Sequence, residues 1–280
     1  MPFVVTPDGT TIHYRVLGRR TGEPLLALQG LGADSRGWIA QQRALGARHR
    51  LILVDNRGVG GSDRPDGPYD LEVMAGDAVA VLDDLGIGSA HVMGASMGGV
   101  LSQVLAVRHP ERVRSLVLAC TACRHHRWRR ELLEEWREVA LTDGMGAVTS
   151  VAARWLVGPR MLRRFQPAIG MLGPLALRVQ PEQFAAQIGA ILDLDDAVRL
   201  ELGAVTVPTR VVVGSQDMLT PMGDAEEVAE LIPDAELTVL GGAAHGLMVE
   251  QSGTFNRVVL EFLERVAPVP VTEGSRGPGG

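Results

Sequence analysis

A serine with glycines two residues to either side points to a nucleophile held on a tight turn. Residues 94–98 read Gly-Ala-Ser-Met-Gly and follow the apolar run His91–Met93. A serine hydroxyl attacks well when the backbone holds it out beside a base, and glycines at these positions leave room for a strand-to-helix turn. The spacing predicts Ser96 as a nucleophile. From this motif alone, a glycine-rich turn after a buried strand is the alternative.

Two later residues could activate Ser96. Asp217 follows the apolar run Arg210–Val213, and His245 follows the alternating segment Ala235–Leu240. A histidine accepts the serine proton when a carboxylate holds its ring in the right tautomer. Because each residue follows a predicted strand, as Ser96 does, we predict a catalytic triad of Ser96, Asp217 and His245.

A short glycine-containing loop could form an oxyanion hole. The tetrahedral intermediate of an acyl-transfer reaction carries an oxyanion, which backbone N–H donors stabilise. Residues 29–32 read Gln-Gly-Leu-Gly after the apolar run Leu25–Leu28. With the triad in this chain order, the sequence resembles the α/β-hydrolase superfamily. By motif position, the resemblance implies oxyanion donors at the backbone N–H groups of Leu31 and Met97. Gln29 stands where many members have histidine.

Further segments narrow the resemblance. Residues 55–63 match a loop that the family uses structurally, and there Asp55 and Arg57 are expected to pair locally. Residues 64–69 and 109–113, with the serine turn, resemble the group of 3-oxoadipate enol-lactonases and small-molecule carboxylesterases. The resemblance implies hydrolysis of an ester or lactone through an acyl-enzyme, with no metal and no organic cofactor.

Short apolar runs alternate with helical patterns, which predicts an α/β fold. We expect a mainly parallel, twisted sheet of about eight strands, with helices on both faces. Residues 121–203 lack a good strand pattern and contain several helical segments, and the resemblance implies a helical cap there. The predicted core is 1–120 and 204–266, followed by a flexible Pro- and Gly-rich tail at 267–280.

Composition limits the partners. The chain has 280 residues, 46% of them hydrophobic, and a net charge of −6 that argues against a nucleic-acid partner. No signal peptide pattern and no stretch long enough to span a bilayer is present, so a cytoplasmic protein without a membrane partner is expected. The expected partner is a small-molecule ester or lactone, and the oligomeric state stays open between monomer and homodimer.

Substrate choice is expected to be encoded mainly in residues 121–203. A few aromatic and apolar side chains there should line the pocket, while most pack the helices. The pocket candidates, some of them from the core, are Gln29, Arg124, Trp128, Trp155 and Leu247.

The basic cluster at 124–130 has two interpretations. It could clamp a substrate carboxylate, since arginine binds carboxylates bidentately. Alternatively it is a solvated face on which Arg129 and Arg130 pair with Glu134 and Glu135, and this second interpretation is favoured.

The two cysteines, Cys120 and Cys123, have a spacing that invites a zinc or redox interpretation. No distant second ligand pair accompanies them, and neither a zinc nor a thioredoxin pattern is complete. Buried structural cysteines are the favoured interpretation, and whether the two are paired stays open.

Other functions on the same scaffold stay open as well. A carbon–carbon bond hydrolase or a perhydrolase could use the same triad. A non-hydrolytic binding protein or a cyclase could retain the scaffold, because fold does not fix function.

Overall fold

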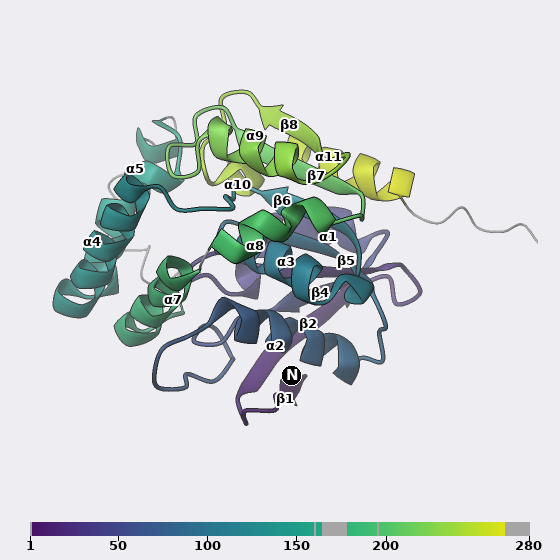
Figure 1. Ribbon diagram of the computed structural model, residues 1–280, viewed down its shortest axis with the longest axis horizontal. Coiled ribbons are helices and arrows are strands. Elements are labelled where there is room, and N and C mark those ends of the chain that lie inside the picture. The colour runs from purple at the N-terminus through teal and green to yellow at the C-terminus, as the bar shows by residue number, and fades with distance from the viewer. Residues whose placement is uncertain (1, 160, 164–177, 195, 267–280) are drawn as a thin grey trace, which may run out of the picture.

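A computed structural model of the chain describes residues 2–159, 161–163, 178–194 and 196–266, so the predicted tail lies outside the described residues. The described residues form one eight-stranded sheet with the order β1-β2-β4-β3-β5-β6-β7-β8 (Figure 1). Strand β2 pairs antiparallel with β1 and β4, and the other neighbours are parallel. The strands are β1 (Phe3–Val5), β2 (Thr11–Gly18), β3 (Pro24–Leu28), β4 (Arg50–Val54), β5 (Ala90–Ala95), β6 (Val113–Ala119), β7 (Thr209–Gly214) and β8 (Glu236–Leu240).

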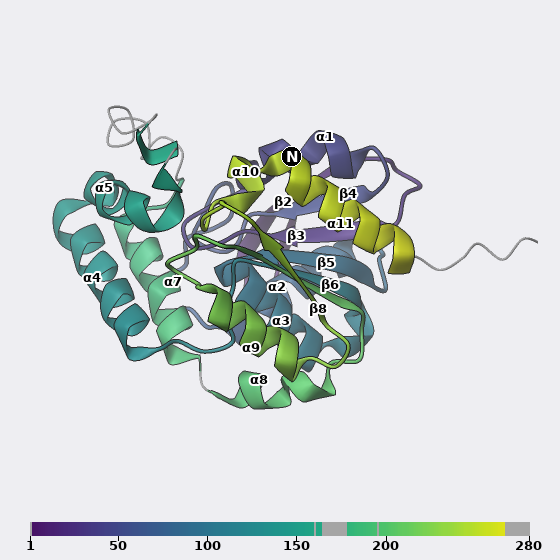
Figure 2. The same cartoon turned by 90° about the horizontal axis from the view of Figure 1, so that it is seen from above.

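Helices lie on both sides of the sheet (Figures 1 and 2). No described helix is both long and apolar enough to cross a membrane. The helices that enter the argument are α1 (Ile39–Gly46), α2 (Leu71–Asp84), α3 (Met97–Arg108), α4 (Arg127–Asp143), α5 (Met145–Leu156), α7 (Pro181–Asp193), α8 (Asp196–Glu201), α9 (Met222–Leu231), α10 (Leu247–Glu250) and α11 (Ser252–Val266).

The alternation of side chains along the central strands builds two cores, one on each face of the sheet. In β3, Leu25 and Ala27 belong to the same cluster as Phe255 of α11. Their neighbours Leu26 and Leu28 belong to the other cluster, with the helices α2 and α3. Successive strand residues point to opposite faces, so a continuous apolar run is buried on both. The predicted α/β fold with a mainly parallel sheet is confirmed.

Helices α4, α5 and α7 are inserted between β6 and β7 and pack on one another beside the sheet (Figure 2). Helix α4 buries Leu132, Leu133, Trp136 and Ala140, a spacing of three and four residues that forms one apolar stripe. Helix α8 instead contacts α3 of the core. The helices that pack on one another in the insertion therefore end with α7, and α8, which precedes the predicted boundary at 203, packs on the core.

Asp55 and Arg57 do not pair with each other, contrary to the expectation from the loop motif. Arg57 binds Asp77 of α2 through two hydrogen bonds of 2.7 Å and also reaches Asp8 at 3.0 Å. Asp55 accepts a hydrogen bond from His13 at 2.9 Å as well as from backbone N–H groups. Both side chains are buried. Their side-chain partners lie far away in the sequence, so the local motif could not predict them.

A buried histidine in β5 is expected to make the fold sensitive to mild acid. Burial, then repulsion from His49 and Arg114, lowers the pKa of His91 to about 4 from the usual 6.5. Between these pH values the unfolded chain binds the proton and the folded chain does not. Stability therefore falls as pH falls, by up to about 1.4 kcal/mol per pH unit.

This prediction can be checked by urea unfolding at about pH 7 and about pH 5, two conditions that bracket the window in which the unfolded state gains the proton. His91→Gln should lose less stability between the two conditions than the native protein. His109→Gln, at a partly exposed position, is the matched control and should change nothing. Equal losses for the native protein and His91→Gln would contradict the assignment.

Candidate active site

Ser96 lies at the turn between β5 and α3, where the chain leaves the sheet. Its backbone has φ 54° and ψ −121°, a conformation that non-glycine residues rarely adopt. Every other residue from 90 to 106 is buried, whereas Ser96 is partly exposed. The strained turn thus presents this side chain and hides its neighbours.

The flanking glycines are required by close backbone approach. A Cβ on Gly94 would lie 2.1 Å from the carbonyl oxygen of Gly98. A Cβ on Gly98 would lie 2.2 Å from the carbonyl oxygen of Leu28 in β3. Both distances are far inside van der Waals contact, so the turn can form here only with glycine at both positions.

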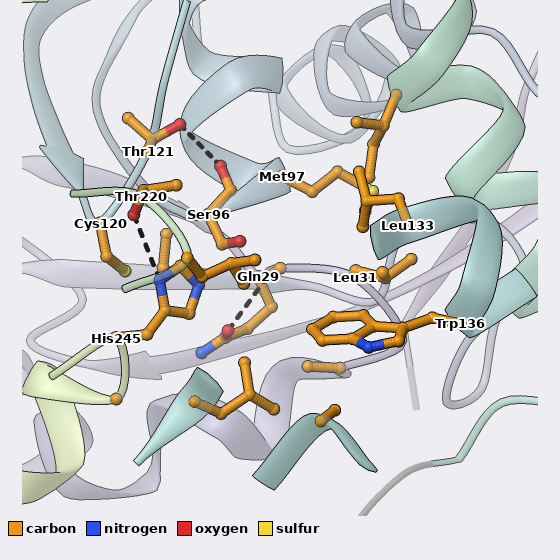
Figure 3. Close-up of a pocket in the computed structure, with 18 of the residues that line it drawn as sticks. Gln29, Leu31, Ser96, Met97, Cys120, Thr121, Leu133, Trp136, Thr220 and His245 are labelled. Atoms are coloured by element: carbon orange, nitrogen blue, oxygen red, sulfur yellow. Dashed lines mark hydrogen bonds between the residues drawn. The ribbon is translucent and has the colours of Figure 1, made fainter. Parts of the chain in front are cut away.

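His245 and Asp217 lie together at the ends of neighbouring strands. His245 Nδ1 is 2.9 Å from Asp217 Oδ2. Because a carboxylate only accepts hydrogen bonds, Nδ1 carries the proton and Nε2 is left as the basic nitrogen. Figure 3 shows the His245 ring on the same side of the pocket as Ser96. Within the described residues no hydrogen bond joins Ser96 Oγ to His245.

Thr220 completes the surroundings of the Asp217 carboxylate. Its hydroxyl donates to Asp217 Oδ2 at 2.8 Å and lies 3.2 Å from His245 Nδ1 (Figure 3). The N–H groups of Leu219 and Thr220 both donate to Asp217 Oδ1 at 2.9 Å. Burial raises the pKa of Asp217, but attraction to the protonated form of His245 and the hydrogen bonds from His245 and Thr220 outweigh it, and the net shift is downward. The carboxylate is therefore held ionised beside the imidazole.

The loop 29–32 lies directly against Ser96. A Cβ on Gly30 would be 3.0 Å from Ser96 Cβ. The N–H of Gly30 donates to Gln29 Oε1 at 3.2 Å. Among the described residues, neither the N–H of Leu31 nor that of Met97 has an acceptor. Two backbone donors are thus available in the neighbourhood of the serine.

Ser96 and His245 open into a cavity of about 460 Å³ between the core and the inserted helices. In Figure 3 these two residues lie at one side, and Leu133 and Trp136 of α4 lie at the other. Most of the lining is apolar, and several of its residues come from the inserted helices: Leu133, Trp136, Val148, Ala152, Leu156, Phe184 and Ile191. An enclosed apolar wall with a few convergent polar groups is typical of a small-molecule site.

The comparisons with known proteins agree with this geometry. Residues 23–146 match the family model described as the alpha/beta hydrolase fold. A putative carbamate hydrolase RutD from Azorhizobium caulinodans is 31% identical over 271 residues, which cover 94% of this chain and 98% of that protein. The chain belongs to the α/β-hydrolase family. It is a hydrolase by this membership.

Two further relatives match the group named from the sequence. The 3-oxoadipate enol-lactonase 2 of Acinetobacter baylyi is 29% identical over 267 residues, covering 93% of this chain and 96% of that protein. The crystal structure of the enol-lactonase from Burkholderia xenovorans LB400 superposes with a TM-score of 0.87 and 29% identity, covering 94% and 100% of the two chains. The resemblance to enol-lactonases is confirmed.

The pocket of this hydrolase agrees in part with the one predicted from sequence. A few aromatic and apolar side chains of the segment 121–203 line it as expected, among them Trp136, Met161 and Phe184. Gln29 lines the cavity, but the described lining does not include the other four candidates. Trp128 and Trp155 stack on each other with ring centroids 6.0 Å apart. Leu247 is fully buried in the core beneath α11, and Arg124 Nε pairs with Glu227 at 2.8 Å.

The basic cluster of the hydrolase is mostly a solvated face, as favoured from the sequence: Arg124, Arg127 and Arg130 are exposed, and Arg127 pairs with Glu131 one turn later. The pairings expected for Arg129 and Arg130 are wrong. Arg129 is buried, forms an ion pair with Asp224 and donates to the carbonyl oxygen of Leu219 at 2.8 Å. Arg130 donates to the carbonyl oxygen of Leu192 at 2.7 Å. These contacts replace the expected pairs with Glu134 and Glu135. Arg129 lines the cavity, but Asp224 already compensates its charge, so it offers no unpaired charge to a substrate.

His125 also lines the cavity and adds no positive charge. Burial, reinforced by Arg129, Arg130 and His126, lowers its pKa to about 3. The imidazole is therefore neutral at ordinary pH, and the described wall suits an uncharged ligand.

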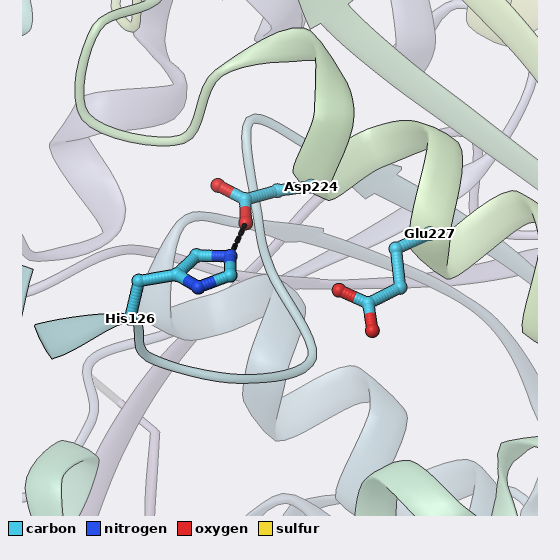
Figure 4. Close-up of side chains that lie close together, drawn as sticks. All are labelled: His126, Asp224 and Glu227. Atoms are coloured by element: carbon cyan, nitrogen blue, oxygen red, sulfur yellow. Dashed lines mark ion pairs between the residues drawn. The ribbon is translucent and has the colours of Figure 1, made fainter.

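A group of three potential metal ligands, none of which lines the cavity, is formed by His126, Asp224 and Glu227 (Figure 4). His126 Nε2 is 3.6 Å from Asp224 Oδ1, and Glu227 lies nearby. Arginines already compensate both carboxylates: Arg129 pairs with Asp224, while Arg124 and Arg199 pair with Glu227. A divalent cation would have to displace them, so the charge balance favours a structural ion-pair network here.

Cys120 and Cys123 are buried and are not joined by a disulfide. Burial raises the pKa of the Cys120 thiol well above its usual range and that of Cys123 to about 12. Both are therefore neutral thiols, whereas redox chemistry and zinc binding use the thiolate. The structural interpretation made from the sequence fits this burial.

Two polar residues of the site went unnoticed in the sequence. Thr220, three residues after Asp217, sits in a loop without periodicity, and nothing marks it as a partner. Gln187 of α7 is a polar residue among the buried apolar residues Phe184, Ile188 and Ile191. An amide surrounded by apolar residues on a helix face needs hydrogen-bond partners, and that signal was available.

Proposed function

We propose that this hydrolase cleaves a small-molecule carboxylic ester or lactone through an acyl-enzyme on Ser96, with Asp217 and His245 completing the triad. The observation that carries the proposal is the His245 ring. A 2.9 Å contact to an ionised Asp217 leaves its second nitrogen basic, in the same cavity as the presented serine. A base oriented in this way is what a serine hydroxyl needs to become nucleophilic.

In the proposed reaction, Ser96 Oγ attacks the substrate carbonyl carbon while His245 Nε2 takes the hydroxyl proton. The carbonyl oxygen becomes an oxyanion, which the N–H groups of Leu31 and Met97 stabilise. The intermediate collapses, the alcohol oxygen leaves with the proton from His245, and an acyl-serine remains. Water then attacks the acyl-serine with His245 again as base, and the second intermediate collapses to the carboxylic acid as Ser96 Oγ leaves and takes the proton back from His245. No metal and no organic cofactor enters these steps.

Helices α4, α5 and α7 are proposed to act as the cap, because they supply the wall opposite Ser96. Leu156 and Val249 line the cavity and are exposed, 36% and 49%. They mark an apolar mouth through which a neutral ester could enter. Most of the acyl or alcohol group would be buried against aliphatic and aromatic side chains.

A substrate panel tests the proposal and its charge preference. We expect 4-nitrophenyl butyrate and a neutral alkyl lactone to be hydrolysed, and a matched ester with a free carboxylate to have a kcat/KM lower by about 10-fold or more. The reason is that an unpaired carboxylate is costly to bury, and the one arginine of the described lining is already paired. A preference for the carboxylate substrate would contradict this assignment of the pocket.

A carbamate is the second candidate substrate, because the relative from Azorhizobium caulinodans is named a putative carbamate hydrolase. The same serine attack would release an amine or alcohol, and the panel should therefore contain an alkyl carbamate. Hydrolysis of the carbamate together with inertness toward every ester would favour this candidate. A cyclase or a binding protein would leave the whole ester panel unhydrolysed or nearly so. A perhydrolase would form the same acyl-serine and is separated by a peracid assay with added hydrogen peroxide, and a carbon–carbon bond hydrolase would prefer a diketone over every ester of the panel.

A further inference from the structure

Gln187, on the inserted helix α7, reaches the loop that carries the proposed oxyanion donor. We propose that Gln187 is a positioning residue for the chemical step, so that the inserted helices affect turnover as well as substrate choice. This inference rests on the proposed function, because it concerns the stabilisation of an oxyanion formed at Ser96.

Gln187 joins two loops of the core through one side chain. Its Oε1 accepts a hydrogen bond from the N–H of Gly32 at 2.9 Å, and its Nε2 donates to the carbonyl oxygen of Arg57 at 3.0 Å. The residue is fully buried. Because no water competes for these groups, both bonds are retained as long as α7 stays in place.

The same helix contacts the loop a second time. Gly32 has φ +70°, and a Cβ there would lie 3.0 Å from Cδ2 of Phe184, which precedes Gln187 by three residues on the helix. Residues three apart share one helix face. Helix α7 therefore meets Gly32 through a hydrogen bond and a packing contact.

The hydrogen bonds of the loop leave one N–H for the substrate. The N–H of Gly30 donates to Gln29 Oε1 and that of Gly32 to Gln187. The carbonyl oxygen of Gln29 accepts from Asn56 Nδ2 at 3.1 Å. The N–H of Leu31, between these anchored residues, has no acceptor among the described residues. Anchors on both sides fix where that N–H points.

Positioning of this kind affects the rate more than the binding of the ground state. Oxyanion donors act at about 2.7–3.1 Å from the developing charge, and loss of one donor costs about 10²–10³ in kcat. Loosening the loop without removing the donor should cost less. We expect a fall in kcat of about 10- to 100-fold, because small displacements at a preorganised site are expensive.

The test uses Gln187→Met, which keeps the side-chain length and removes the amide. With 4-nitrophenyl butyrate, kcat should fall by about 10- to 100-fold while KM changes by less than about 3-fold. The affinity for a trifluoromethyl ketone, which forms a tetrahedral adduct with an oxyanion, should fall by about the same factor as kcat/KM. A residue that only stabilised the fold would lower the melting temperature without changing kcat of the folded protein.

The matched control is Gln183→Met, the same substitution four residues earlier on α7, at a partly buried position without a recorded hydrogen bond. It should leave kcat, KM and the ketone affinity unchanged. If Gln187→Met does not fold, Gln187→Asn, whose shorter amide cannot span both partners, takes its place with the same expected direction.

The inference and the proposed function fail in different ways. Native kcat in Gln187→Met, or a loss confined to KM, would overturn the positioning role and leave Ser96 as the nucleophile. An equal loss of kcat in Gln183→Met would also overturn it, because the effect would then belong to the helix as a whole. Absence of ester, lactone and carbamate hydrolysis in the native protein would overturn the proposed function.

Discussion

Ser96→Ala is expected to lower ester turnover by about 10⁶-fold, to the limit of detection, while leaving the fold intact. The expected loss is this large because the residues of a triad act together. Removal of the nucleophile alone therefore costs about as much activity as removal of all three members. The side chain of Ser96 makes no recorded hydrogen bond within the described residues, and alanine keeps the Cβ. Stability should therefore change little.

Turnover of 4-nitrophenyl butyrate and a thermal unfolding curve measure the two parts of this prediction. Ser150→Ala is a suitable control. Ser150 is exposed on α5, and its hydroxyl donates a hydrogen bond to the carbonyl oxygen of Gly146 in the same helix. Native activity in that variant is expected. Substantial turnover by a folded Ser96→Ala protein would remove Ser96 from the mechanism.

Asp217→Asn is expected to lower kcat by about 10⁴-fold. The amide keeps the size of the carboxylate and can still accept the N–H bonds of Leu219 and Thr220 through its oxygen. Its NH₂ group would then face Nδ1 of His245, where it favours the wrong ring tautomer and leaves no charge to stabilise the imidazolium. The base would no longer be available at Nε2.

Single-turnover and steady-state rates for Asp217→Asn would measure this loss. Asp234→Asn provides the comparison, because Asp234 is exposed and does not line the cavity. Only the Asp217 substitution should change the rate. A fall of less than about 10-fold would mean that the charge of Asp217 is not needed to orient the base, against the triad logic.

The catalytic candidates could be predicted from the sequence because each depends on local order. Ser96 follows a strand and is flanked by glycines, and Asp217 and His245 each follow a strand. The carboxyl ends of parallel strands meet at one edge of the sheet. Strand assignment alone therefore brings the three residues together, even though 121 and 28 residues separate them (217 − 96 and 245 − 217).

The pocket could not be predicted in the same way, because it depends on how the inserted helices pack. Arg129 is one of several arginines in a basic run, and its burial is decided by Asp224, which lies 95 residues later. Trp128 and Trp155 are neighbours only because α4 and α5 pack side by side, and there they cover each other. Long side chains at a helix end can turn to the core or to solvent, and the sequence pattern does not distinguish the two.

The contacts of Gln187 could be predicted in part: the sequence indicates that the side chain needs partners, but not which residues they are. The amide of Gln187 among apolar residues of α7 indicates that partners exist. Those partners are Gly32, 155 residues earlier, and Arg57, 130 residues earlier. Tertiary pairing over such distances is set by the whole packing arrangement. An amphipathic pattern therefore reports that a polar contact is needed and not which loop provides it.

The central claim is that Ser96 is an activated nucleophile, and active-site labelling tests it most directly. The native protein is treated with a fluorophosphonate, and the intact mass and the modified peptide are measured. The account predicts one adduct per chain, on Ser96, with the rate of labelling reduced in Asp217→Asn. No adduct on the folded protein, or an adduct on a residue other than Ser96, would contradict it.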